Sequence, residues 1–159
     1  LRFNQLEILV HPKSYLHAIV KFNNGLSKLL VHDTNMTIPI FNSIYLNNEK
    51  KIKSKKINLG ILNNLDLKKI DNLRFPVVRI IKKLPDKDSL FETIIVSAND
   101  KLVNLFLNNK IKFTDISIIL LKICSLKEFD KFKRKEPKNI DEINHLADYV
   151  SLKIDSLGV

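Results

Sequence analysis

The sequence predicts an α+β fold, in which a short β-hairpin and sheet portion is followed by a linker and a small C-terminal helical bundle. Two apolar runs near the start meet at an Asn-Gly pair, which is the strongest local signal for a hairpin turn. An Asn- and Lys-rich stretch with few apolar residues follows, and beyond it apolar residues recur at helical spacing. We therefore expect three parts, at residues 1–47, 48–75 and 76–159.

The first stretch of interest is a strand followed by a polar turn. Residues 6–11 predict a buried strand, and Pro12 ends it because proline cannot donate to a strand ladder. Polar side chains at strand ends often line pockets, so Ser14 and His17 are candidate site residues. His11 and His17 lie six residues apart and would share one side of an extended chain. The spacing alone also fits ordinary polar groups at a sheet edge, and two histidines do not make a metal site.

The elements that follow are predicted from alternation, turn residues and helical spacing. Thr37 is the expected N-cap of a short helix that ends near Tyr45, and the stretch after it reads as an exposed linker. Pro76 suits the first turn of the next helix. The expected order is strand 17–22, turn 23–25, strand 26–31, polar loop 32–35, helix 37–45, linker 47–56, and helices over 76–84, 89–108, 114–123 and 139–157, with a charged loop at 131–138.

The expected helix caps and buried faces complete this scheme. Ser89 or Asp88 should cap the second long helix, and Thr114 or Asp115 the third. In the last helix a stripe of apolar residues that starts at Ile140 should be buried. These residues are Ile140, Ile143, Leu146, Ala147, Val150 and Ile154, and His145 lies off the stripe, at the surface.

The composition limits the classes of protein to consider. No apolar run approaches the about 20 residues needed to span a bilayer. The formal net charge of +10 favours a nucleic-acid-binding module, yet lysine is spread along the chain and arginine occurs only at Arg2, Arg74, Arg79 and Arg134. Cys124 is the only cysteine, so an internal disulfide is excluded and a buried, unreactive thiol is expected.

Four separated blocks share a pattern with one known enzyme family, in matching order and spacing. The first is Glu7, Leu9, His11, Pro12, Ser14 and His17; the second is Met36, Pro39 and Ile40; the third is Leu65, Leu67, Asp71, Arg74, Phe75 and Pro76; the fourth is the Ile-x-Phe-x-Asp-Ile turn within 108–116. Through these blocks nearly the whole chain resembles 1-deoxy-xylulose-phosphate reductoisomerase. The chain departs from the family at Lys13, Ala18, Asp66 and Ile70, and at His32, Thr34 and Asn35, where the family loop has glycine, proline and aspartate.

The resemblance implies a fold, an activity and site residues. Residues 1–47 would end the catalytic domain, 48–75 would be the linker, and 76–159 the C-terminal α-helical domain. The family converts 1-deoxy-D-xylulose 5-phosphate to 2-C-methyl-D-erythritol 4-phosphate in isoprenoid biosynthesis, by a metal-assisted rearrangement and hydride reduction from NADPH. Ser14, His17 and Met36 would line the substrate pocket, with Met36 near the nicotinamide. Lys13 either contacts the substrate phosphate or is simply exposed at the surface, and we favour the surface.

The same resemblance implies that the cofactor- and metal-binding residues lie outside this chain. The chain has three glycines and no glycine-rich dinucleotide motif, so NADPH and a divalent metal (Mg or Mn) would be bound mainly by residues upstream. Because the chain begins at Leu1 and its only methionine is Met36, we expect it to be the C-terminal part of a longer protein. That protein would be a homodimer in the bacterial cytoplasm or a plastid, acting on a phosphosugar without nucleic acid or membrane.

Two alternatives stay open at this stage. A non-enzymatic basic module would explain the charge but none of the four blocks. A homologue with altered chemistry would explain the departures around Thr34 and in the segment 96–100. Met36 has a plainer interpretation too, as an ordinary core residue.

Overall fold

The computed structural model describes residues 5–45 and 50–158. The chain divides into two compact units, each of which is considered by itself. The first, the hairpin unit, is Ile8–Ile70, and the second, the helical unit, contains Asp71 and the residues after it together with those before Ile8. The linker expected at 48–75 begins partly outside the described residues and includes a short helix and a short strand.

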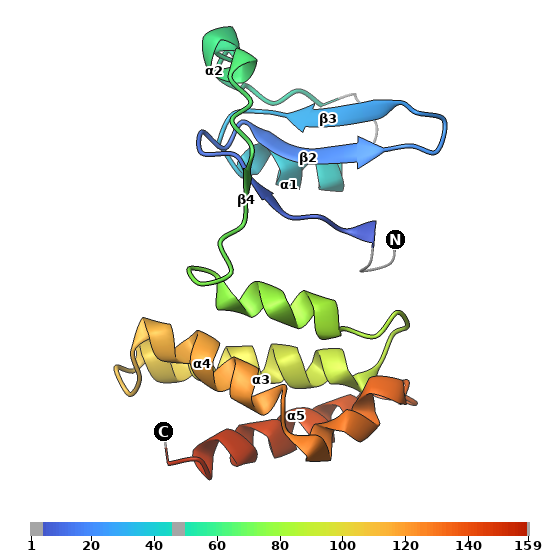
Figure 1. Cartoon of the computed structure of the whole chain (residues 1–159), viewed down its shortest axis with the longest axis vertical. Helices are drawn as coiled ribbons and strands as arrows, with labels where there is room; N and C mark the ends of the chain where they lie inside the picture. The colour runs from blue at the N-terminus through green and yellow to red at the C-terminus, as the bar shows by residue number, and fades with distance from the viewer. Residues whose placement is uncertain (1–4, 46–49, 159) are drawn as a thin grey trace. The chain divides into compact units, whose positions relative to one another are not determined.

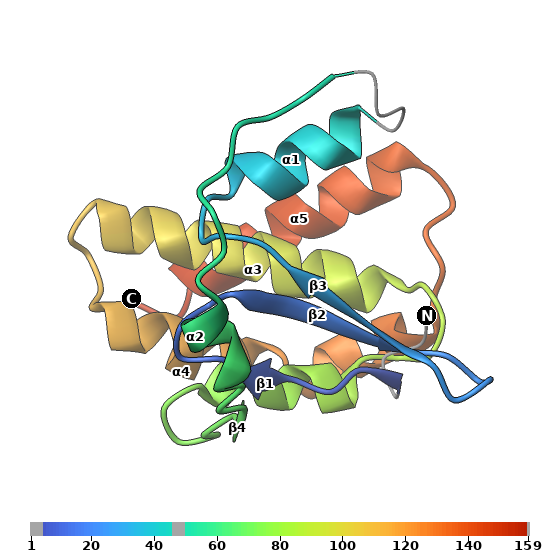
Figure 2. The same cartoon turned by 90° about the horizontal axis from the view of Figure 1, so that it is seen from above.

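The hairpin unit is built on two antiparallel strands, β2 (Leu16–Lys21) and β3 (Ser27–Val31), as Figures 1 and 2 show. Gly25 lies in the turn with a φ of 86°, a left-handed conformation that glycine adopts without steric cost. The Asn24 side chain accepts a hydrogen bond from the Leu26 amide at 3.1 Å. The hairpin prediction is therefore confirmed, with a register irregularity between Leu16 and Ala18.

The strand expected at residues 6–11 is shorter and more exposed than predicted. Only β1 (Leu9–Val10) is extended, and it pairs antiparallel with β4 (Lys68–Lys69). The side chains of Leu9 and Val10 are each 38% exposed, so the prediction of a buried strand is wrong for this chain. A two-residue ladder provides too little neighbouring surface to bury them.

Two short helices complete the hairpin unit. Helix α1 (Thr37–Ile44) has Met36 at its N-cap, so Thr37 is its first residue and not the predicted cap. The Asn35 side chain accepts from the Thr37 amide at 2.9 Å, and the N-cap residue Met36 makes no side-chain capping bond. Helix α2 (Leu59–Asn63) is capped by Asn58. Residues 50–58 contain no helix or strand, as expected for the linker, whereas 46–49 lie outside the described residues.

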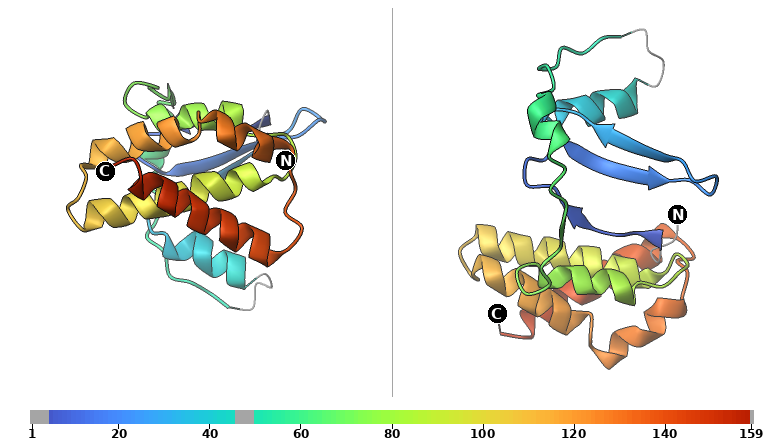
Figure 3. Two further views of the ribbon diagram at one scale, coloured as in Figure 1. Left: turned by 90° about the horizontal axis from the view of Figure 1, so that it is seen from below. Right: turned by 45° about the horizontal axis from the view of Figure 1, so that its top comes forward.

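The helical unit packs three α-helices and two 3₁₀-helices around one apolar core (Figure 3). The elements are η2 (Pro76–Lys83), α3 (Leu90–Leu107), α4 (Phe113–Ile123), η3 (Lys127–Arg134) and α5 (Ile140–Asp155). Apolar side chains of every element contribute to the core, including Ile80, Phe91, Ile94, Leu102, Leu120, Ile123, Phe129, Leu146, Val150 and Ile154. This arrangement confirms the predicted helical bundle.

Most predicted boundaries in this unit hold. The Ser89 hydroxyl accepts from the Phe91 amide and caps α3, as expected. Neither Thr114 nor Asp115 caps α4; Lys112 is the N-cap, and Asp115 accepts from its amide at 2.8 Å. The predicted loop at 131–138 is wrong in its first half, because η3 extends to Arg134.

Two further expectations concern single side chains. Ile140 is 74% exposed, because the last helix begins there, before its apolar stripe reaches the core. Cys124 is 2% exposed, which confirms a buried thiol.

Candidate functional site

The turn after β1 is organised by the imidazole of His11. Its Nδ1 atom accepts hydrogen bonds from the backbone amides of Tyr15 and Leu16, each at 3.1 Å. The Ser14 amide also donates to the His11 carbonyl oxygen at 2.9 Å. An Nδ1 atom that accepts two amides cannot carry a proton, so the ring is neutral with its proton on Nε2. The side chain is buried, and its Nε2 atom has no hydrogen-bond partner among the described residues.

Ser14 lies at the reversal of this turn. Its φ is 53°, in the left-handed region that non-glycine residues seldom adopt. The chain is therefore not extended between His11 and His17. The prediction that the two rings share one side assumed an extended chain, and that assumption does not hold. The Ser14 side chain is exposed, as is that of Lys13.

His17 lies on β2 and contacts a second histidine that sequence reasoning missed. The rings of His17 and His32 stack with centroids 3.6 Å apart and planes 4° from parallel. His32 follows β3, and its amide donates to the Tyr15 carbonyl oxygen at 3.2 Å, next to the turn built by His11. His17 is exposed, whereas only 8% of the His32 surface is exposed. A cross-strand pairing of residues 16 and 31 was the available signal for this contact.

Asp33 is a second residue that the sequence did not single out. Its carboxylate accepts from the amide of Asn35 at 2.8 Å and from the amide of Lys55 at 3.1 Å. These two bonds hold the pKa of the Asp33 carboxyl below its ordinary value, and the bond from Asn35 has the larger effect. The Asp-x-Asn spacing is a turn signal, because aspartate side chains often accept from the amide two residues on. Asp33 thereby fixes the loop that carries His32.

Met36 occupies the N-cap of α1 and is 61% exposed. It is therefore not the core residue of the plainer interpretation. Among the hydrogen bonds and ring contacts of the described residues, none joins Ser14 or Met36 to His17. The structure thus brings together His17 and His32, and places Ser14 and Met36 at the surface of the same unit.

The fit of a metal or a dinucleotide to this chain can be tested directly. In the part of the chain that the structure describes, no group of three or more His, Cys, Asp or Glu side chains could hold a metal ion. The three glycines lie far apart in the sequence, at positions 25, 60 and 158, and form no phosphate-binding loop. The residues present therefore fit neither group by themselves.

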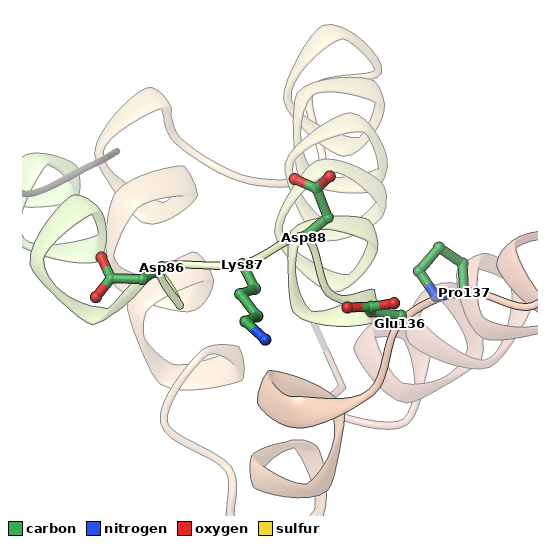
Figure 4. Close-up of a pocket in the computed structure, with 5 residues that line it drawn as sticks. All are labelled: Asp86, Lys87, Asp88, Glu136 and Pro137. Carbon is green, nitrogen blue, oxygen red and sulfur yellow. The ribbon is translucent and has the colours of Figure 1, made fainter. Parts of the chain in front are cut away.

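The depressions in the helical unit are open and highly charged. One, of about 470 Å³, is lined by Asp86, Lys87, Asp88, Glu136 and Pro137, on the loops before α3 and α5 (Figure 4). Another, of about 320 Å³, is lined by residues of η3 and α5, among them Glu128 and Tyr149, whose side chains are hydrogen-bonded to each other. None of the candidate residues Ser14, His17 and Met36 lines either one.

No helix in residues 5–45 and 50–158 has the length and apolar character of a bilayer-spanning segment.

Comparisons with known proteins agree with the blocks found in the sequence. The family described as "DXP reductoisomerase C-terminal domain" matches residues 32–150. The chain is 74% identical over 159 residues to a 1-deoxy-D-xylulose 5-phosphate reductoisomerase of Pelagibacter ubique. The match includes 100% of this chain and 41% of that protein. It is 29% identical over 134 residues to an apicoplastic reductoisomerase of Plasmodium falciparum, covering 84% of this chain and 27% of that one.

Solved structures show the same fold. A reductoisomerase from Zymomonas mobilis in complex with NADPH superposes with a TM-score of 0.74 at 22% identity, over 97% of this chain and 39% of that chain. A DOX-P reductoisomerase in complex with NADPH, fosmidomycin and magnesium gives a TM-score of 0.78 at 21% identity, over 96% and 38% of the two chains. The chain therefore spans between 27% and 41% of the length of these proteins.

Proposed function

The chain belongs to the DXP reductoisomerase C-terminal domain family, and on that premise we propose that it is the C-terminal part of an NADPH-dependent reductoisomerase. The complete enzyme would convert 1-deoxy-D-xylulose 5-phosphate to 2-C-methyl-D-erythritol 4-phosphate. The 74% identity to the Pelagibacter ubique enzyme, which extends over the whole chain, is the observation that carries this proposal. The bacterial and apicoplastic relatives support a location in the cytoplasm or a plastid.

The cofactors of such an enzyme would lie on residues that this chain does not provide. Related structures are complexes with NADPH and with magnesium, and these groups supply the hydride and polarise the substrate oxygens. The described residues provide neither a set of metal ligands nor a dinucleotide loop. We therefore expect the 159-residue chain alone to oxidise no NADPH, and turnover by the isolated chain would contradict the proposal.

Within the chain, we propose that Ser14, His17 and Met36 contact the phosphosugar. All three are exposed. Ser14 lies in the turn that the His11 ring holds, and His17 follows it on β2. An imidazole can donate and accept hydrogen bonds, so His17 suits a ligand rich in hydroxyl groups. The hydroxyl of Ser14 offers a second donor and acceptor. The exposed Met36 thioether offers an apolar contact.

The test is the His17→Gln variant of the complete enzyme, assayed by NADPH oxidation at varied substrate concentration. We expect KM to rise about two- to twelvefold, the value of one net hydrogen bond, with kcat changed less. His145→Gln is the matched control, because His145 is an exposed histidine of the helical unit. Unchanged kinetics in His17→Gln would remove His17 from the substrate site.

We also propose that the complete enzyme is a homodimer. Exposed apolar side chains on the hairpin support a protein contact there, since Val20, Leu29 and Leu30 are each about half exposed. Sedimentation of the complete enzyme across a range of concentrations tests the assignment. A monomer at every concentration would contradict it.

The net charge of +10 is the observation that favours the alternative of a basic binding module. Phosphate binding by such a module would weaken steeply with salt. Titration with generic RNA and DNA at two salt concentrations separates the two proposals, because the reductoisomerase assignment expects no such binding.

A further inference from the structure

We propose that His32 is a positioning residue that holds the imidazole of His17 in the orientation in which it meets the substrate. The proposal rests on the proposed function, in which His17 contacts the phosphosugar. Its basis is the stacked pair, whose ring centroids lie 3.6 Å apart with planes 4° from parallel. A ring in face-to-face contact with a fixed neighbour loses the freedom to swing about its side-chain bonds.

His32 is held firmly enough to serve as that fixed neighbour. Its backbone amide donates to the Tyr15 carbonyl oxygen at 3.2 Å, which ties it to the start of β2. Its Nδ1 atom lies 2.5 Å from the Asp33 carbonyl oxygen, and since a carbonyl oxygen only accepts, Nδ1 carries the proton. Only 8% of the surface of His32 is exposed, so the residue is buried.

The support behind His32 extends one step further. The Asp33 carboxylate accepts from the amides of Asn35 and Lys55, and Lys55 comes from a separate segment of the hairpin unit. These bonds fix the loop from which the His32 ring projects. A continuous series of contacts therefore supports His17. The Lys55 amide binds the Asp33 carboxylate, the Asp33 carbonyl oxygen binds the His32 ring, and that ring stacks on His17.

The two histidines differ in access to solvent, as the proposal requires. His32 is buried, whereas His17 is exposed. The stack covers one face of the His17 ring, and the ring nitrogens make no hydrogen bond among the described residues. A group that is oriented in advance and still has free donor and acceptor positions binds a ligand with less loss of conformational entropy.

Two substitutions separate the ring of His32 from its hydrogen bond. His32→Phe keeps a flat ring and removes the Nδ1 donor, whereas His32→Asn keeps a donor near that position and removes the ring. In the complete enzyme we expect His32→Asn to raise KM about two- to tenfold, the value of one aromatic contact, with kcat changed less. His32→Phe should stay close to the parent enzyme. Equal kinetics in the two variants would overturn the proposal.

A second measurement does not depend on activity. In the 159-residue chain labelled with ¹³C-histidine, three-bond couplings of His17 report whether its χ1 angle is fixed or averaged. We expect a single rotamer in the parent chain and in His32→Phe, and averaged couplings in His32→Asn. Averaged couplings in the parent chain would overturn the stack itself.

The two readouts distinguish failure of this inference from failure of the proposed function. Absence of reductoisomerase activity in the complete parent enzyme would overturn the proposed function, while the couplings still decide whether His32 holds the His17 ring. Full activity with equal KM values in the two variants would overturn only the positioning role. Far-UV circular dichroism of each variant confirms that the hairpin remains folded, and His145→Asn serves as the control for loss of an exposed histidine ring.

Discussion

The Tyr149 hydroxyl donates a hydrogen bond of 2.6 Å to the Glu128 carboxylate and so joins α5 to η3. The Lys153 ammonium, one turn further along α5, lies 2.7 Å from the other carboxylate oxygen. These two bonds hold the pKa of the Glu128 carboxyl below its ordinary value of 4.5, and the bond from Lys153 has the larger effect. The same bonds raise the pKa of Tyr149 and of Lys153.

Glu128→Gln should therefore destabilise the helical unit at neutral pH and have less effect in acid. Because the pKa of Glu128 is lower in the folded state, its contribution is fully present above pH 4.5 and is lost as the pH falls through the folded value. Urea unfolding of parent and variant at pH 7 and pH 3 measures the difference. Glu136→Gln, which alters a carboxylate with no ion pair among the described residues, is the control.

At alkaline pH the stabilisation by this cluster depends on pH in the opposite direction, because it is lost as the pH rises. The raised pKa values of Tyr149 and Lys153 mean that their contribution is present below pH 10 and is lost as the pH rises through their folded values. If the difference in unfolding free energy between parent and Glu128→Gln stayed constant from pH 3 to pH 11, the proposed stabilisation by Glu128, Tyr149 and Lys153 would be contradicted.

Ile123→Ala should cost about 2–5 kcal/mol of unfolding free energy, the range for removal of a buried isoleucine. Ile123 is fully buried in α4, whereas Ile118 on the same helix is 63% exposed. Ile118→Ala is therefore a matched control, with an expected change within about 0.5 kcal/mol. Urea denaturation monitored by circular dichroism measures both. Equal losses in the two variants would mean that the outer face of α4 is covered in solution.

His11→Phe should loosen the turn that carries Ser14. The replacement removes the acceptor of the Tyr15 and Leu16 amides. The Leu16 amide is buried, and leaving it unpaired costs about 1–3 kcal/mol, whereas the partly buried Tyr15 amide costs less. Hydrogen exchange of these two amides should accelerate, while exchange in α3 stays the same. Long-range ¹H–¹⁵N spectra of the parent chain should show the proton of His11 on Nε2, and a proton on Nδ1 would contradict the hydrogen-bond assignment.

Cys124 should react with thiol reagents only after the helical unit opens. Burial raises the pKa of its thiol above the ordinary value of 9.0, so little thiolate forms at neutral or mildly alkaline pH. Labelling with iodoacetamide at pH 8 should be slow in buffer and fast in urea above the unfolding transition. Rapid labelling of the folded chain would contradict burial of the thiol.

Local signals in the sequence are sufficient for much of the fold. The Asn24-Gly25 turn, the Ser89 cap and the apolar spacing of α3 each act over a few residues, and each appears in the structure as expected. The extent of β1 is not local, because it depends on pairing with Lys68–Lys69, nearly 60 residues away. The start of α4 was misplaced because Asp115 bonds backwards to Lys112 instead of capping.

The candidate site was predictable only in part for the same reason. The sequence predicts His17 as a site residue from its place after a strand, whereas its stack on His32 requires the hairpin register to be known. By its spacing Asp33 is an ordinary loop residue, and the amide that it binds, that of Lys55, lies 22 residues further along the chain. Contacts of this kind arise from tertiary placement, for which neither periodicity nor turn chemistry carries a signal.

The hairpin has a practical consequence for anyone who prepares this chain alone. A two-stranded sheet leaves one backbone edge of β2 and one of β3 without a strand partner among the described residues. Exposed Ile19, Val20 and Leu29 lie along these strands, and such edges recruit strands of other molecules. Aggregation during concentration, and its suppression by charged substitutions at these positions, would then be a property of the correctly folded 159-residue chain and not of a misfolded one.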